Sequence, residues 1–274
     1  MKNAWSQAGR LIGLLLLCAL ALQLYFLLRV AMMLISDPQS TSFQRSEIWR
    51  LAVEQHEVLW SQQWVDDDKL STSLKRAVIA SEDAGFAEHS GVEWDALEKA
   101  WERNQKAEER AGRLNEQLAK REATREAARE AAREASRKAA AQAKAPAPRA
   151  TPKIVGGSTI TQQLAKNLFL SGERTALRKA QEFVITFMLE ALLDKRRILA
   201  IYLNSVEWGE GIFGAQAAAR HYFRVDAAQL GVSQAARLAV MLPAPKRFEK
   251  RPGSAYVVGR AGTVAARMGA VELP

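Results

Sequence analysis

The chain has 274 residues, enough for one large domain or two small ones. Its single cysteine, Cys18, excludes an intramolecular disulfide and a cysteine-based metal cluster, and three histidines argue against a multi-histidine metal site. The net charge of +9 is concentrated in residues 103–153, where 14 Lys and Arg face 7 Glu and contribute +7. This localisation argues against a nucleic-acid partner and favours a surface of anionic lipid head groups.

An apolar run near the N-terminus predicts a membrane anchor over residues 11–35. The run is longer than a signal-peptide core, and no clear small-residue cleavage site follows it, so we expect it to be retained. Lys2 and Arg10 precede the run and Asp37 follows it, which predicts a cytoplasmic start over residues 1–10 and an extracytoplasmic remainder. Arg29 either snorkels to the outer interface or follows a shorter span that ends at residue 28.

Residues 36–69 are expected to connect this anchor to a domain that begins near residue 70. An apolar helical run over residues 70–80 then leads into residues 82–91, which combine four ionisable side chains, a phenylalanine and two glycines. Glu82 would sit at the end of a rigid helix and face a loop. That position suits a general base, which has to be held still and partly desolvated yet open to a substrate. A plain helix end with solvated acids remains the alternative.

Residues 103–153 differ in composition from the rest of the chain. They contain a four-residue Arg-Glu-Ala repeat and end in a stretch rich in alanine and proline. Ala, Glu, Arg and Lys favour helix, but no apolar stripe runs through the repeat. We therefore predict a solvent-exposed, partly helical insertion without a catalytic role, and a partner-binding or lipid-surface role stays open.

A glycine-hydroxyl turn precedes the next helical run, at residues 156–170. Ser158 or Thr159 can cap that helix, with Gln162 or Gln163 reciprocating, and such a helix start can also bind an anion. A nucleotide P-loop is excluded because the Gly-Lys-Ser/Thr ending is absent. The basic side chains that could line one groove here are Lys166, Arg174, Arg178 and Lys179.

A second acidic residue, Glu182, lies within a strongly apolar helix predicted over residues 178–193. It shares a helical row with Ile185 and Leu189, so its carboxylate has to be either paired or functional. An ion pair with Arg178, four residues earlier, is the plain alternative. On the same helix, we expect the packing face to be formed by Phe183, Val184, Phe187, Met188, Ala191 and Leu192. Further helices are predicted over residues 195–206, 215–223, 235–242 and in the tail, and strand signals are weak, so the fold is mainly α.

Five segments, in order, resemble the motifs of the peptidoglycan glycosyltransferases, glycosyltransferase family 51. They are Glu82-Asp83-x-x-Phe86-x-x-His89-x-Gly91; Gly156 to Gln163 with Lys166-Asn167; Arg178-Lys179-x-x-Glu182; Arg197-Ile198-Leu199 through Tyr202-Leu203-Asn204 to Gly209; and Arg237-Leu238-Ala239 to Leu242-Pro243. With one anchor and no expected penicillin-binding domain, the chain is similar to the monofunctional members. The insertion is longer than the family usually has, and Ala244 stands where a more polar residue is common.

The resemblance implies a lysozyme-like domain over residues 70–274, interrupted at 103–153, with a membrane-embedded subregion. It implies a single-pass protein of the bacterial inner membrane whose catalytic domain is periplasmic. The implied reaction polymerises lipid II into β-1,4 glycan strands for the cell wall, with inversion and release of undecaprenyl pyrophosphate. The implied partners are lipid II, the growing glycan chain and membrane lipid, with cell-division or elongation proteins as further candidates.

The resemblance also assigns roles to individual residues. Glu82 would be the base, and Glu182 would act on the leaving-group side, directly or by holding a metal. No cofactor is required by the sequence, although Mg²⁺ or Mn²⁺ could serve there. The expected substrate-binding residues are Lys166, Arg174, Arg178 and Lys179 toward the pyrophosphate, and Ser158, Thr159, Gln162, Gln163 and Asn167; the expected loop-shaping residues are Asp83, Phe86, His89 and Gly91.

Two other functions fit part of this pattern. A lysozyme-like glycan hydrolase or lytic enzyme also uses acidic residues on a glycan, but it has no pyrophosphate leaving group for the cations near Lys166 to neutralise. A membrane-anchored scaffold without activity would have no need of Glu82, Lys166, Arg174 and Glu182 together.

Overall fold

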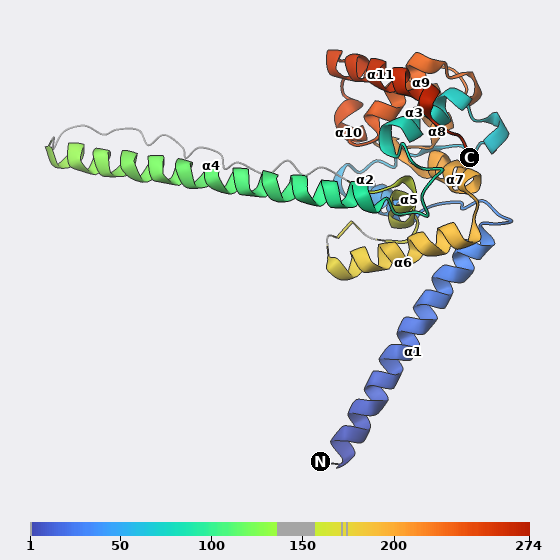
Figure 1. Cartoon of the computed structure of the whole chain (residues 1–274), viewed down its shortest axis with the longest axis horizontal. Helices are drawn as coiled ribbons and strands as arrows, with labels where there is room; N and C mark the ends of the chain where they lie inside the picture. The colour runs from blue at the N-terminus through green and yellow to red at the C-terminus, as the bar shows by residue number, and fades with distance from the viewer. Residues whose placement is uncertain (1, 136–156, 171, 174) are drawn as a thin grey trace. The chain divides into compact units, whose positions relative to one another are not determined.

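The computed structural model describes residues 2–135, 157–170, 172–173 and 175–274, with side chains from residue 7 and up to residue 128 in the long helix. The chain divides into two compact units (Figure 1): Met1–Glu93 with Ser158–Pro274, and Trp94–Gly157. The first unit holds all the predicted site residues that the structure describes. Over residues 94–135, the second unit is one long helix.

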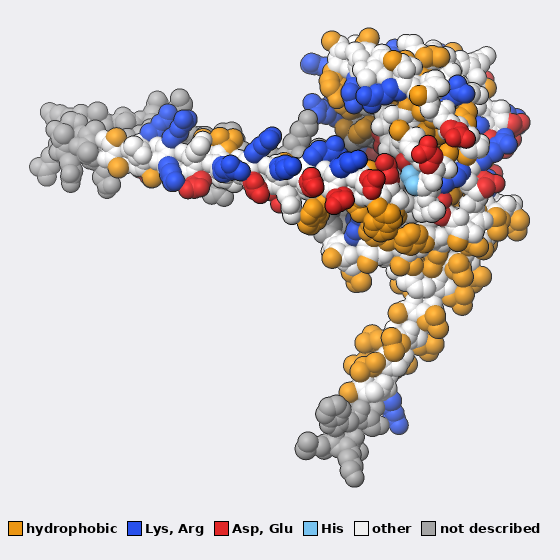
Figure 2. All heavy atoms as spheres, viewed as in Figure 1, with side chains coloured by type: hydrophobic (Ala, Val, Ile, Leu, Met, Phe, Trp, Pro, Cys, Tyr) orange, Lys and Arg blue, Asp and Glu red, His pale blue; other side chains and the backbone are white. Residues whose placement is uncertain are grey.

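Helix α1 (Lys2–Met32) contains residues 11–32 of the anchor predicted over residues 11–35. Its segment Gln7–Met32 is long and apolar enough to cross a membrane, with a mean hydropathy of 2.6. Apolar side chains cover α1 in Figure 2, and most of them are exposed. The helix continues through Arg29, and its end packs on the first unit, where Phe26, Val30 and Met33 are buried. The last turns of the anchor are therefore part of the folded domain.

The first unit is built mainly from short helices, which confirms the mainly α prediction. They are α2 (Ser42–Glu54), α3 (Thr72–Glu82), α5 (Ile160–Phe169), α6 (Ala176–Leu192), α7 (Lys195–Ser205), α8 (Ala215–Phe223), α9 (Val232–Met241), α10 (Pro245–Phe248) and α11 (Ala255–Arg267), with 3-10 turns at Asp67–Lys69, Ala227–Gln229 and Met268–Ala270. Helix α3 packs against α9 and α11, and α5 packs against α2, α6 and α7. Helix α5 is thus central to the half of the unit where the motif residues gather.

A small sheet accompanies the helices. Its strands are β1 (Ser61–Gln62), β2 (Glu207–Gly209) and β3 (Ile212–Phe213), in the order β1-β3-β2. Strand β1 runs parallel to β3, and β2 runs antiparallel to it. Gly211, in the turn before β3, has φ +71°, and a Cβ there would lie 2.5 Å from the carbonyl oxygen of Leu59. The turn therefore requires glycine.

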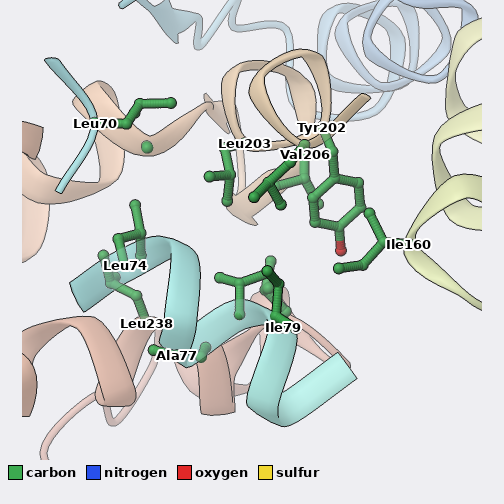
Figure 3. Close-up of a cluster of buried hydrophobic side chains, with 14 of the residues drawn as sticks. Leu70, Leu74, Ala77, Ile79, Ile160, Tyr202, Leu203, Val206 and Leu238 are labelled. Atoms are coloured by element: carbon green, nitrogen blue, oxygen red, sulfur yellow. The ribbon is translucent and has the colours of Figure 1, made fainter. Parts of the chain in front are cut away.

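Buried side chains of α3 hold the helix that ends at Glu82. Leu74 and Ile79 are fully buried, and Figure 3 shows them facing Leu203 and Tyr202 of α7 and Leu238 of α9. Full burial of each such leucine or isoleucine contributes about 1.5–3 kcal/mol. Tertiary packing along α3 therefore fixes the C-terminal end of the helix, where Glu82 lies.

Helix α6 buries a different face from the one that its apolar pattern suggests. Val184 and Phe187 are exposed, whereas Glu182, Ile185 and Leu189 are buried. The difference arises because α6 is apolar nearly all round, so hydrophobicity alone does not select the packed side.

Helix α6 also contacts the anchor helix. Gln181 of α6 exchanges hydrogen bonds with Gln23 of α1, at 2.7 and 3.0 Å. The exposed apolar side chains of α6 suit a surface in contact with lipid.

The second unit contains helix α4 (Trp94–Ala135), drawn in green in Figure 1. Two exposed ion pairs lie on this helix, each between residues one helical turn apart. They join Glu109 to Arg113 at 3.2 Å and Glu116 to Lys120 at 2.7 Å. The insertion predicted over residues 103–153 is thus helical as far as residue 135, and the helix begins nine residues before it. Residues 136–153 lie outside the described part of the chain.

Candidate active site

The loop after α3 is held by the carboxylate of Asp83. Its Oδ2 accepts the backbone N–H of Ile160 at 2.9 Å, and its Oδ1 lies 2.8 Å from Nε2 of His89. The N–H of Gly91 donates to Nδ1 of His89 at 3.1 Å, so Nε2 carries the proton that faces Asp83. Asp83 and His89 therefore tie residues 83–91 to the start of α5.

Gly91 ends this loop at a point where no side chain fits. Its φ is +84°, and a Cβ would lie 2.7 Å from Cγ of Glu190 and 2.8 Å from Cγ2 of Thr186 on α6. Its carbonyl oxygen accepts the hydroxyl of Thr159 at 2.6 Å. Phe86, earlier in the loop, is fully buried beneath the ammonium of Lys195, 4.6 Å from the ring centroid. The loop is thus clamped by α5, α6 and α7.

Helix α5 begins with a capping box made by Thr159 and Gln162. The hydroxyl of Thr159 accepts the N–H of Gln162 at 3.2 Å, and Oε1 of Gln162 accepts the N–H of Thr159 at 3.0 Å. Both side chains are buried. Among the predicted capping residues, the structure selects Thr159 and Gln162, and Gln163 is left for another partner.

Glu82 is that partner. Nε2 of Gln163 donates to Oε2 of Glu82 at 3.0 Å. Burial raises the pKa of Glu82 above the usual value of 4.5, and the neighbouring charge of Asp83 adds to this increase. The hydrogen bond from Gln163 and the charge of Lys166 act in the opposite direction. Glu82 is thus a partly desolvated carboxylate at the end of a rigid helix, as a general base requires.

A cleft of about 310 Å³ brings eight of the predicted site residues together. Its lining residues are Phe43, Ser158, Gln162, Gln163, Lys166, Asn167, Leu170, Gly172, Arg178, Lys179 and Glu182. Gln163 links this cleft to Glu82. Among the described residues, buried Nε2 of Gln162 and buried Nε of Arg178 have no hydrogen-bond partner, so both donors can serve a ligand. Arg174 lies outside the described residues.

Glu182 contacts two cations of its own helix. Its Oε2 accepts from a guanidinium nitrogen of Arg178 at 2.9 Å, and its Oε1 accepts from Nζ of Lys179. The carboxylate is almost completely buried, whereas Lys179 keeps about a third of its side chain exposed, 34%. The expected ion pair with Arg178 is therefore present, and it belongs to a three-charge cluster that lines the cleft.

Sequence reasoning missed three residues of the site. Phe43 of α2 lines the cleft, Lys195 covers Phe86, and Tyr202 donates its hydroxyl to Oε1 of Gln163 at 2.9 Å. Tyr202 belongs to the fourth of the five motifs, but it was not among the predicted site residues. Phe43 carried no signal, because residues 36–69 were expected only to connect the anchor to the domain and lie far from the cleft-lining motifs in sequence.

The chain is similar in sequence to known transglycosylases. The family model described as "Transglycosylase" matches in two stretches, residues 52–153 and 137–269. A curated "Biosynthetic peptidoglycan transglycosylase" of Burkholderia pseudomallei is 48% identical over 256 residues, 93% of this chain and 83% of the relative. The proteins of that name from Burkholderia multivorans and Paraburkholderia phytofirmans are 46% and 45% identical, over 93% of this chain and 86% and 88% of theirs.

The chain belongs to the transglycosylase family. The recognition made from five ordered motifs is confirmed, and with it the prediction of a glycosyl-transferring enzyme. The transglycosylase domain is lysozyme-like and mainly α, as expected. The cleft between α5 and α6 holds eight of the site residues that were predicted from the family's motifs.

Proposed function

We propose that this transglycosylase polymerises lipid II into β-1,4 glycan strands and releases undecaprenyl pyrophosphate. The observation that carries the proposal is a cleft lined by a cluster of cations and by Gln163, whose amide donates to the partly desolvated carboxylate of Glu82. The 4-hydroxyl oxygen of the acceptor GlcNAc forms a bond to C1 of the donor MurNAc. The bond between C1 and the pyrophosphate oxygen breaks with its electron pair, so the configuration at C1 is inverted.

Glu82 takes the proton of the attacking hydroxyl. Its raised pKa brings it nearer to neutral pH, which makes it a better proton acceptor than a solvated glutamate. The packing of α3 and the clamped loop behind it keep the carboxylate in place during the reaction.

Charge that develops on the leaving pyrophosphate is neutralised by Lys166, Arg178 and Lys179. All three line the cleft, and the two α6 cations are held in place by Glu182. Both oxygens of Glu182 already contact cations, and the described residues contain no group of three or more acidic, histidine or cysteine side chains suited to a metal. These residues therefore do not fit a protein-built metal site.

The anchor gives this reaction its place at the membrane. Helix α1 is compatible with a single crossing, and its end packs on the same unit as the cleft, with Phe26 5.3 Å from the ring of Phe169 on α5. We propose an inner-membrane protein with a periplasmic catalytic domain, because lipid II and undecaprenyl pyrophosphate both carry membrane-bound tails. The membrane would then deliver the substrate directly to the cleft.

The test is incubation of the purified full chain with lipid II in detergent. The expected product is long glycan strands that a muramidase cuts into disaccharide units. Absence of polymer from folded protein would refute the proposal. Incubation with preformed glycan separates the hydrolase alternative, which would release fragments where a polymerase releases none.

A further inference from the structure

A chain of two hydrogen bonds connects the buried core to the carboxylate of Glu82. The hydroxyl of Tyr202 donates to Oε1 of Gln163 at 2.9 Å, and Nε2 of Gln163 donates to Oε2 of Glu82 at 3.0 Å. A carboxamide has one acceptor end and one donor end. A donor held at Oε1 therefore turns the NH₂ end of Gln163 toward the carboxylate.

Tyr202 is placed so that it stays a donor. Its side chain is fully buried, and Figure 3 shows it reaching from α7 with its hydroxyl beside Ile160 of α5 and its ring above Ile79 of α3. Burial raises the pKa of Tyr202 well above its usual value of 10, and the charges of Glu82 and Asp83 act in the same direction. The phenol consequently keeps its proton at any pH at which the enzyme works.

We propose that Gln163, oriented by Tyr202, is a positioning residue for Glu82, holding Oε2 and leaving Oε1 to take the acceptor proton. Among the described residues, no hydrogen bond reaches Oε1 of Glu82. This role differs from the sugar-binding role expected from the motif, and Tyr202 becomes functional although it touches no substrate. The inference rests on the proposed function, because it assumes that Glu82 is the base.

The direction of the effect follows from the hydrogen bond. Donation by Gln163 favours the ionised carboxylate and lowers the pKa of Glu82 against the effect of burial. Without the Tyr202 hydroxyl, only the NH₂ end of Gln163 is held, by Glu82 and by the carbonyl oxygen of Ser158 at 3.5 Å, and the amide oxygen can more readily turn toward the carboxylate. The pKa of Glu82 should then rise, and a larger fraction of the enzyme should carry a protonated base at neutral pH.

The experiment compares Tyr202→Phe with Tyr222→Phe, using the full chain and lipid II. Tyr222 is a matched control because its hydroxyl also makes a largely buried hydrogen bond, to the carbonyl oxygen of Trp208 at 2.8 Å, away from Glu82. Tyr202→Phe should move the acid limb of the kcat/KM profile up by about one pH unit, so that kcat/KM at pH values on the acid side of that limb falls about tenfold. KM for lipid II should change less than about twofold, since the substrate contacts remain.

A second variant, Gln163→Met, removes the same link from its other end and covers the case in which Tyr202→Phe does not fold. It should shift the acid limb in the same direction. Adding Tyr202→Phe to it should give no further shift, because the two residues act through one chain of hydrogen bonds.

The inference is overturned if the wild type polymerises lipid II with an acid limb that both variants leave in place, or if their effects add. Failure of the wild type to make polymer would instead overturn the proposed function, so the two failures are distinct.

Discussion

Glu82 is a partly buried acid beside the cleft and Glu182 is a buried acid that lines it, yet their surroundings are opposite. Glu82 receives one hydrogen bond from a neutral amide, and its pKa is raised by burial. Glu182 contacts a guanidinium and an ammonium from its own helix. The first environment makes a carboxylate ready to accept a proton, whereas the second uses a carboxylate to fix two positive charges.

This contrast separates two tasks of one displacement reaction. Proton removal needs a basic group that is not already neutralised, and charge stabilisation needs cations that do not have to reorganise. Substitutions that remove one carboxylate at a time should therefore differ in their effect on stability as well as on rate.

The largest effect is expected from Glu82→Gln. It should lower polymerisation about 100- to 10,000-fold, since a general base contributes that much. The thermal midpoint should be unchanged or higher, because the variant no longer holds a carboxylate that burial disfavours. Lipid II turnover and a melting curve on the same preparation check both points, and near-normal turnover would remove Glu82 from the role of base.

Glu182→Gln should lower both activity and stability. Turnover should fall about 100-fold, because Arg178 and Lys179 lose the group that positions them. Breaking a mostly buried charge cluster should cost about 2 kcal/mol, a decrease of about 4–8 °C in thermal midpoint. A melting temperature equal to that of Glu82→Gln would show that the two environments do not differ in the way described.

A third acid, Glu207 of β2, sharpens the comparison because it is buried outside the cleft. Burial raises its pKa to about 7, although Nζ of Lys246 lies 3.6 Å away. The pKa of Glu207 is higher in the folded state than in the unfolded state. The contribution of its carboxyl group to the free energy of unfolding is therefore full below about pH 4.5 and is lost as pH rises through about 7. The loss amounts to about 3 kcal/mol.

The wild type should lose thermal midpoint between pH 5 and pH 8, a range that includes the Glu207 pKa of about 7. In Glu207→Gln this decrease should be smaller. Melting curves across that range provide the measurement. The acid limb of the activity profile should stay where it is in the wild type. Movement of that limb would indicate that carboxylates outside the cleft control the base.

The smallest effect is expected from removal of residues 110–147. The described part of this segment belongs to helix α4, whose ion pairs Glu109–Arg113 and Glu116–Lys120 are exposed and contribute little, about 0–1 kcal/mol each. Lipid II turnover within about twofold of the full chain is expected for a segment with no catalytic side chain. Loss of turnover with retained fold would show that the insertion takes part in the reaction.

The sequence allowed much of this arrangement to be predicted. Helical periodicity located most of the helices, because amphipathic packing leaves a regular pattern, and the five motifs brought Glu82, Lys166 and Glu182 into one hypothesis. Three features could not be read from it. The packed face of α6 was missed because the helix is apolar nearly all round; Phe43 reaches the cleft only through tertiary packing; and the bond from Tyr202 to Gln163 spans 39 residues.

The most direct test of the account is the pH dependence of kcat/KM for lipid II polymerisation by the unaltered chain. We expect an acid limb, because Glu82 in the free enzyme must be ionised to accept the proton. Its midpoint should lie above 4.5, the usual glutamate value, because burial raises the pKa of Glu82. The same limb should be absent from the residual activity of Glu82→Gln. A profile with its midpoint at or below the usual value, or a limb that persists in Glu82→Gln, would contradict the account.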